Sequence, residues 1–431
     1  MNAYQQKIEI RDLVEGMFIC QLPIPWKETP FPLQGFYVHS NDDKTQLEKY
    51  CSYVFVDIIR SRTKNLRLSP DLIKNNKNDE TTKSNVMPSF SKRENNSSTK
   101  KISAKPILKN YARYAHLPVH DLRKTYKVAI KIHSKIVAAI KQFSEIEEKN
   151  REKIFTLIKD NSRLLVESAL HNPDALIWLT RLQSQKADIF NHSINAAIWG
   201  LVLGRHLGLE RDILNDLTLA LLLAKTGLLN ENKFSETKTP LDYIFESVAN
   251  LSDAKDITPG VITTIKTHME RYDGSGGPRG LTGDKIPYLG KIAGIVDCYE
   301  SLLNPLDNYP PLTCSEAIGF LFSQRDIKFQ ADLVEEFIQA IGIYPTGSLV
   351  ELNNNEIGLV LESPRNERLF PKLLMVVDKD GHKIKQPRTL NLADDKTSLS
   401  IKRSIPNSTV NINYSALGNK ETNTLRKIFS L

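Results

Sequence analysis

THMERYDGSGGPRGLTGDKIP, the stretch from Thr267 to Pro287, is the strongest indication of the fold in this sequence. Glycine and proline crowd its middle, where Asp273–Gly276 (DGSG) is followed by Pro278 and Gly280. These residues favour turns of defined geometry, and their fixed offsets are hard to obtain by chance in a helical protein. The stretch therefore predicts a loop of definite shape.

The chain around this loop, from about residue 118 to about residue 342, has apolar residues at helical spacing. The pattern is clear from Val128–Ile130 to Val137–Ile140. The run from Leu214 to Leu229 is almost continuously apolar, which predicts one buried helix. We therefore expect the main domain to be all-α.

The regions on either side of the helical part have patterns typical of strands. Short apolar runs bounded by turn residues occur at Lys7–Ile10, Tyr53–Asp57, Ser348–Leu352, Ile357–Leu361 and Lys372–Val377. We therefore predict a mainly α fold class, with a small β-rich N-terminal domain and a short C-terminal β region.

A segment rich in Lys, Asn, Ser and Thr follows the N-terminal domain, from about residue 61 to about residue 105. It has too little apolar surface to offset the conformational entropy lost on folding, so we expect a flexible basic linker. The predicted divisions are an N-terminal domain (1–60), a linker (61–110), a helical domain (111–345), a strand region (346–395) and a polar tail (396–431).

The composition is that of a globular protein, since hydrophobic residues make up 40% and charged residues 25% of the 431 positions. No window approaches the roughly 18 apolar residues that a membrane span needs, and the first residues show no apolar signal core. We therefore expect a cytoplasmic protein without a membrane span. The four cysteines (Cys20, Cys51, Cys298 and Cys314) have no C-x-x-C spacing, so neither a zinc ribbon nor a disulfide framework is predicted.

The net charge of +8 raises the question of a nucleic-acid partner. Much of the excess positive charge falls in the linker, which lacks interleaved aromatic residues and any nucleic-acid-binding motif. A solvated linker explains this charge, so we do not expect nucleic acid as a partner.

Three segments that point to a family follow one another along the chain. The first is LQSQKADIFNHSINAAIWGLVLGRHLGL with His192 and Ser193, the second is the loop Thr267–Pro287, and the third is GKIAGIVDCYESL with Asp297. Together they resemble the HD-GYP family of the HD superfamily, metal-dependent phosphodiesterases that hydrolyse the bacterial second messenger cyclic di-GMP. The N-terminal region is similar to the small domain of unknown function that often precedes HD-GYP domains. The resemblance implies an HD-type helical bundle.

The resemblance also implies a site for two or three iron or manganese ions, held by imidazoles and carboxylates. The residues remaining at the matching positions are His192, His268 and Asp297. Asp188 lies four residues before His192, on the same helical face, where some family members carry an additional Glu. This vestigial set would hold one iron or manganese ion weakly at most.

Other positions depart from the family. Its second helix carries His-Asp-x-Gly-Lys, where this sequence has Ala224, Lys225 and, in place of the family's Lys, Leu228. Met269 replaces the second His of the loop, and a further family His has no counterpart. Alanine has no lone pair, an ammonium group only donates, and a thioether is a poor ligand for these metals. We therefore expect no intact catalytic site and no cofactor.

Lys225 suggests a specific hypothesis: its ammonium group acts as a resident cation that neutralises Asp297 and Asp188 in place of a metal. A distance above about 6 Å from both carboxylates would contradict it. The alternative is that Lys225 extends from its helix end into solvent.

The loop carries the residues that the resemblance points to as nucleotide or partner contacts. In the family's Gly-Tyr-Pro the tyrosine is absent here, and Lys291 stands where the family usually has Arg, which loses bidentate geometry. Solvated charge is an equally good account of Arg279. The candidate contacts are Arg271, Asp273, Gly274, Gly276, Gly277, Pro278, Arg279 and Lys291.

The sequence thus favours a degenerate HD-GYP signalling protein, catalytically impaired and acting as a receptor or scaffold in cyclic di-GMP signalling. Cyclic di-GMP, signalling proteins and, as an option, a second copy of the chain are the partners to test. One alternative is a cyclic di-GMP phosphodiesterase with a reduced metal site. A second alternative is a purely structural interaction module that has lost nucleotide binding.

Overall fold

The computed structural model separates into two compact units, residues 1–101 and 102–431. The linker prediction falls almost wholly outside the described residues. The structure describes residues 5–14, 17–24, 36–38, 41–57, 109–145, 148–182, 188–229, 241–251, 254, 256–306, 309–362, 370–394, 399–406 and 409–410.

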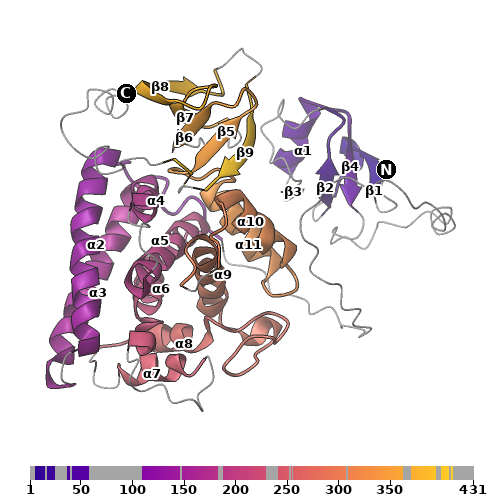
Figure 1. Ribbon diagram of the computed structural model, residues 1–431. Helices are drawn as coiled ribbons and strands as arrows, with labels where there is room; N and C mark the ends of the chain where they lie inside the picture. The colour runs from indigo at the N-terminus through magenta and orange to yellow at the C-terminus, as the bar shows by residue number, and fades with distance from the viewer. Residues whose placement is uncertain are drawn as a thin grey trace. The chain divides into compact units, whose positions relative to one another are not determined.

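The N-terminal unit contains a four-stranded antiparallel sheet in the order β1-β4-β2-β3 (Figure 1). Ile8, Ile19, Val54 and Val56 are buried against Leu47, which lies on the one regular helix described in this unit. The predicted strands near residues 7–10 and 53–57 are thus present. The elements are β1 (Gln5–Glu9), η1 (Ile10–Asp12), β2 (Phe18–Gln21), β3 (Phe36–Tyr37), α1 (Asn41–Glu48) and β4 (Tyr53–Asp57).

The second unit is helical over most of its length, as the apolar spacing predicted. Two long helices, α2 and α3, form a hairpin along one side of a bundle whose centre is α5, α6 and α9 (Figure 1). No helix among the described residues is both long and apolar enough to cross a membrane. The helices are α2 (Leu122–Glu145), α3 (Glu148–His171), α4 (Pro173–Leu182), α5 (Ile189–Leu207), α6 (Arg211–Leu223), α7 (Tyr243–Ala249), α8 (Pro259–Thr267), α9 (Tyr288–Leu303), α10 (Cys314–Ser323) and α11 (Ala331–Ile341).

Helices α5 and α6 approach each other closely because glycines lie at their interface. A Cβ atom on Gly200 would stand 2.6 Å from Leu221 Cδ1, and one on Gly204 would stand 2.5 Å from Leu214 Cδ2. Both distances are shorter than carbon atoms tolerate, so larger residues would push α6 away. This packing brings the end of α6 close to the first turns of α5.

The prediction of one helix from Leu214 to Leu229 needs correction. Helix α6 ends at Leu223 and a short 3₁₀ helix, η4, spans Thr226–Leu229. Ser247 of α7 explains the break, because its hydroxyl donates to the Ala224 carbonyl and accepts from the Gly227 N–H. A tertiary contact therefore replaces the helical hydrogen bonds, and a periodicity of apolar residues cannot reveal it.

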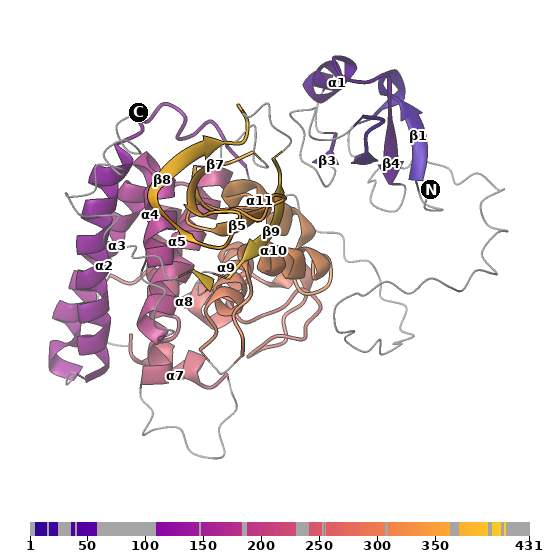
Figure 2. The same cartoon turned by 45° about the horizontal axis from the view of Figure 1, so that its top comes forward.

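An antiparallel five-stranded sheet in the order β8-β7-β6-β5-β9 follows the bundle (Figure 2). Its inner face packs on Trp178 of α4, next to Leu349, Leu359 and Leu374. The strand β9 lies beyond residue 395, where the sequence pattern had ended, so the sheet reaches further along the chain. The strands are β5 (Leu349–Leu352), β6 (Ile357–Glu362), β7 (Lys372–Val377), β8 (Lys383–Asn391) and β9 (Ile401–Ile405).

Candidate functional site

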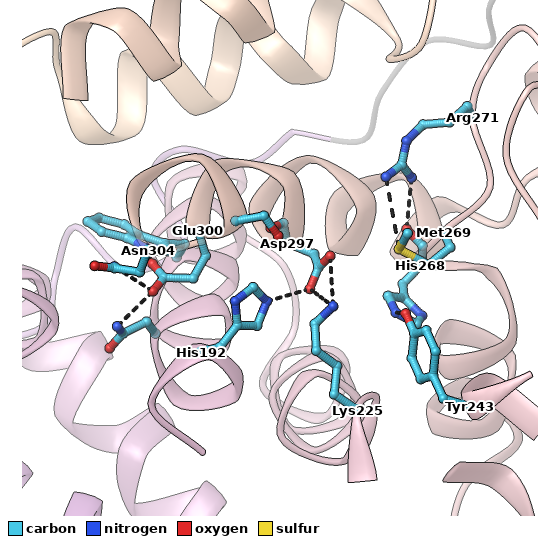
Figure 3. Close-up of polar contacts among 12 residues, drawn as sticks. His192, Lys225, Tyr243, His268, Met269, Arg271, Asp297, Glu300 and Asn304 are labelled. Carbon is cyan, nitrogen blue, oxygen red and sulfur yellow. Dashed lines mark hydrogen bonds and ion pairs between the residues drawn. The ribbon is translucent and has the colours of Figure 1, made fainter. Parts of the chain in front are cut away.

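Three elements bring the central polar residues of the bundle together (Figure 3). His192 lies in the first turn of α5, Lys225 lies two residues after the end of α6, and Asp297 lies in the middle of α9. Asp188 is the N-cap of α5, where its carboxylate accepts from the backbone N–H of Asn191 at 2.7 Å. That cap fixes the start of α5 and with it the position of His192.

Asp297 is the centre of this cluster and is almost fully buried. The Nε2–H group of His192 donates to its Oδ1 atom at 2.9 Å. Burial alone would raise the pKa of Asp297, but Lys225 and His192 outweigh it and hold that pKa well below its usual value. Asp297 is therefore an ionised carboxylate inside the protein.

The ammonium group of Lys225 is the counter-ion. Its Nζ atom lies 3.1 Å from Oδ1 and 3.3 Å from Oδ2 of Asp297, and 9% of its side chain is exposed. Burial would lower the pKa of Lys225, but the carboxylate outweighs burial and raises it. The predicted proximity of Lys225 to Asp297 is confirmed.

The other half of that hypothesis, neutralisation of Asp188, is wrong. Asp188 directs its carboxylate to the backbone and side chain of Asn191, and among the described residues it forms no ion pair with Lys225. The alternative, that Lys225 extends into solvent, is wrong as well, because only 7% of the residue is exposed.

His268, just after α8, lies beside this pair. Its Nδ1–H group donates to the Ile265 carbonyl at 2.8 Å, so Nε2 carries the lone pair, and it accepts from the Tyr243 hydroxyl at 3.1 Å. Burial lowers the pKa of His268 to about 4, so the ring is neutral at pH 7. Burial raises the pKa of Tyr243 to about 12, which keeps its hydroxyl protonated as a donor.

The donor set does not fit the two-metal centre that the resemblance implies. The Nε2 lone pair of His268 is engaged by Tyr243, Nε2 of His192 carries the proton donated to Asp297, and both oxygens of Asp297 face Lys225. The buried Nδ1 atom of His192 makes no hydrogen bond in the described part of the chain, but it lies across the ring from Asp297. Within the described ranges no three His, Cys, Asp or Glu residues are grouped so as to hold a metal.

Two residues of the cluster were missed by sequence reasoning. Tyr243 belongs to a helix with no distinctive motif, and no local signal connects it with His268. Glu300 lies one turn after Asp297, and its carboxylate accepts from Asn195 and Trp199 at 2.9 Å each and from Asn304 at 2.8 Å. Burial raises the pKa of Glu300, and the offset of three residues from Asp297 was the available clue.

The Gly-rich loop is held by Glu270. Its two carboxylate oxygens accept from the backbone N–H groups of Arg279 and Leu281, each at 2.8 Å. Gly274 has φ +83°, and a Cβ atom on Gly276 would stand 2.3 Å from the Met269 carbonyl oxygen. The loop therefore has the defined shape that its turn residues predicted.

The predicted contact residues of the loop differ in how free their side chains are. The guanidinium of Arg271 donates to the carbonyls of His268 and Glu270, and Lys291 pairs with Asp284 at 2.7 Å. Asp273 accepts from Ser275. Arg279, by contrast, is exposed and is tied to the protein through its backbone, so its side chain is the most accessible cation of the predicted set. Gly277 and Pro278 lie within the same loop.

A helical bundle with a histidine on α5, an aspartate on α9 and this loop between them defines an HD-type domain. Comparison with known families agrees: residues 178–333 match the HD domain, 5–155 match a domain of unknown function (DUF3391), and 349–412 match the KOW domain associated with HD domains. The chain thus carries an HD domain with an N-terminal DUF3391 region, and at this level the resemblance is confirmed. The DUF3391 match runs beyond the compact N-terminal unit and through α2.

The relatives include cyclic di-GMP phosphodiesterases. PA4108 of Pseudomonas aeruginosa is 27% identical over 216 residues, covering 48% of this chain and 52% of that protein. PdeB of Borreliella burgdorferi is 26% identical over 249 residues, covering 56% and 62%. The matched region thus spans about half to three fifths of these relatives. Among solved structures, Bd1817, a HDG"Y"P protein from Bdellovibrio bacteriovorus, has a TM-score of 0.42 and 15% identity, covering 77% of this chain and 98% of that one.

Proposed function

We propose that this protein is a catalytically impaired HD-GYP protein that acts as a receptor or scaffold in cyclic di-GMP signalling in the cytoplasm. Two relatives named as cyclic di-GMP phosphodiesterases support the choice of nucleotide. The loop, with its ordered backbone and the exposed Arg279, supports ligand or partner binding.

The single observation that carries the proposal is the buried ion pair between Lys225 and Asp297. Hydrolysis of a phosphodiester by this class of enzyme needs a metal-activated water. Here the ammonium group of Lys225 bonds the carboxylate of Asp297. The Nε2 atom of His268, which would serve as a metal ligand, accepts a hydrogen bond from Tyr243. A chain with these contacts retains the fold but not the means to activate water.

Binding of cyclic di-GMP depends, in this proposal, on Arg279 of the loop. A guanidinium group recognises phosphate through two parallel N–H bonds, and Arg279 is free to present one. Asp273, Gly274, Gly276, Gly277 and Pro278 shape the loop around it, while Arg271 and Lys291 act through the loop that they hold.

The rival function is a cyclic di-GMP phosphodiesterase that works with a reduced metal site, as the names of the relatives suggest. The third reading is a structural interaction module without nucleotide binding. Turnover separates the first rival from our proposal, and nucleotide affinity separates the second.

The test combines two measurements on the full chain. Hydrolysis of cyclic di-GMP is followed under anaerobic conditions with iron or manganese supplied, and binding is followed by calorimetry. We expect no turnover and measurable binding. Replacing Arg279 with Ala should weaken binding about tenfold, as expected for loss of a charge-assisted contact worth about 1.5 kcal/mol. Lys379→Ala, in an exposed turn of the C-terminal sheet, is the matched control. Turnover would overturn the proposal, and absence of binding would favour the structural module.

A further inference from the structure

We infer that Lys225 and Tyr243 permanently occupy, in charge and in hydrogen bonding, the place of the metal ions, so that this domain folds and remains stable without metal. The inference deepens the proposed function and rests on it, because both concern the same site. It assigns a role to Tyr243, which no sequence motif indicated.

The charge of the cluster comes first. Asp297 is buried, and a buried carboxylate needs a cation or several donors. Lys225 supplies the cation at 3.1 and 3.3 Å from the two oxygens, and His192 supplies a further donor at 2.9 Å. A divalent ion placed beside Asp297 would face the ammonium group at short range, and like charges in a buried site repel strongly.

The remaining lone pair of the site belongs to His268, the other retained imidazole. The Tyr243 hydroxyl donates to its Nε2 atom at 3.1 Å. The Lys225 ammonium also lies 5.6 Å from the centre of the Tyr243 ring, within the range of a cation–π contact. One residue pair therefore engages both the carboxylate and the imidazole (Figure 3).

Helix α7 is held against the segment that carries Lys225. Tyr243 and Ser247 are four residues apart and lie on the same face of this helix. Ser247 bonds the Ala224 carbonyl and the Gly227 N–H, on either side of Lys225. Gly227 permits this approach, because a Cβ atom there would stand 2.1 Å from the Tyr243 carbonyl oxygen. Helix α7 is thus locked to the segment that carries Lys225, and the same contact positions both substitutes.

The test measures metal content and thermal stability of the full chain purified without chelator. We expect fewer than about 0.1 iron or manganese ions per chain, since a bound structural metal would be stoichiometric. We also expect the same Tm with chelator, with Mn²⁺ and with neither. A stoichiometric metal, or a Tm that falls with chelator, would overturn the inference.

The variant Lys225→Asp tests the substitution itself, because it removes the ammonium group and places a second carboxylate beside Asp297 and His192. We expect Mn²⁺ to raise the Tm of this variant by several degrees and to leave the wild-type Tm unchanged. Adding Tyr243→Phe, which frees Nε2 of His268, should tighten Mn²⁺ binding about tenfold. Lys266→Asp, the same charge change at an exposed position on α8, is the control.

A Lys225→Asp variant that folds and takes up no Mn²⁺ would also contradict the inference. If that variant does not fold, Tyr243→Phe alone provides the test. It should bind no Mn²⁺, because Lys225 is still present, and Mn²⁺ uptake by it would contradict the inference. The proposed function fails separately: turnover by metal-free protein would overturn it and leave this inference standing, whereas bound metal without turnover would do the reverse.

Discussion

The Gly-rich loop and the end of helix α6 border the same polar cluster, but they are held by different kinds of contact. The loop is fixed by backbone N–H groups bonded to Glu270 and by glycines at close approaches. The end of α6 contributes a single side chain, Lys225, bonded to Asp297. A loop built on backbone bonds keeps its shape when its neighbours change. The chemistry of the cluster, in contrast, depends on a few side chains, each of which one substitution can replace.

The largest effect should follow from breaking the ion pair. Replacing Lys225 with Met leaves Asp297 buried without its cation, and we expect a loss of about 3–5 kcal/mol in the free energy of unfolding. Urea denaturation monitored on the helical domain measures it. Lys266→Met, at an exposed position, should change stability by less than about 0.5 kcal/mol.

A double variant sharpens this result. Lys225→Met combined with Asp297→Asn removes both charges and keeps an acceptor for His192. We expect it to recover more than half of the loss, because a buried pair replaced as a whole costs little. Equal losses in the single and double variants would mean that packing of the Lys225 stem, not its charge, stabilises the end of α6.

The next effect concerns Glu336, another buried carboxylate, which receives hydrogen bonds from Lys109, Tyr111 and His206. Burial would raise the pKa of Glu336, but these donors lower it from 4.5 to about 2. Because the folded-state pKa is depressed, the stabilisation is present above pH 4.5 and is lost as the pH falls toward 2.

We expect acid to remove about 3 kcal/mol through Glu336 as the pH falls from 4.5 to 2, because its pKa is lowered from 4.5 to about 2 and each pKa unit corresponds to about 1.4 kcal/mol. The measurement compares urea unfolding at pH 6 and near pH 3 for the wild type and for Glu336→Gln. The Gln variant should lose less stability between the two pH values. An identical pH dependence in both proteins would assign the acid sensitivity to another group.

The smallest effect should come from the loop. In Glu270→Gln one carboxylate oxygen becomes an NH₂ group, which cannot accept from the backbone N–H of Arg279 or Leu281. We expect a loss of about 1.5–2 kcal/mol and weaker cyclic di-GMP binding. Calorimetry and urea unfolding measure both, with the exposed Glu362→Gln as the control. A loss larger than that of Lys225→Met would reverse the comparison between the two regions.

The sequence alone determined the fold class and the place of the loop. Apolar spacing identified the helical region, short apolar runs identified strands at both ends, and turn residues identified the loop. These features depend on local periodicity and backbone preference, which a sequence displays directly. The sequence also showed that Lys225 stands at a position where the family has a metal ligand. Its nearness to Asp297 could be predicted, because the resemblance aligned the segments that carry the two residues with the family's helices.

Only the tertiary structure decided how the side chains of the site are paired. Tyr243 bonds His268 and Glu300 bonds Trp199 across distances that no local pattern encodes. Helix α6 ends at Leu223, although the apolar run continues, because the hydroxyl of Ser247 on another helix donates to the carbonyl of the next residue, Ala224. Each of these outcomes is set by which donor and acceptor meet in the buried interior, and unpaired polar groups there are costly enough to override local preference.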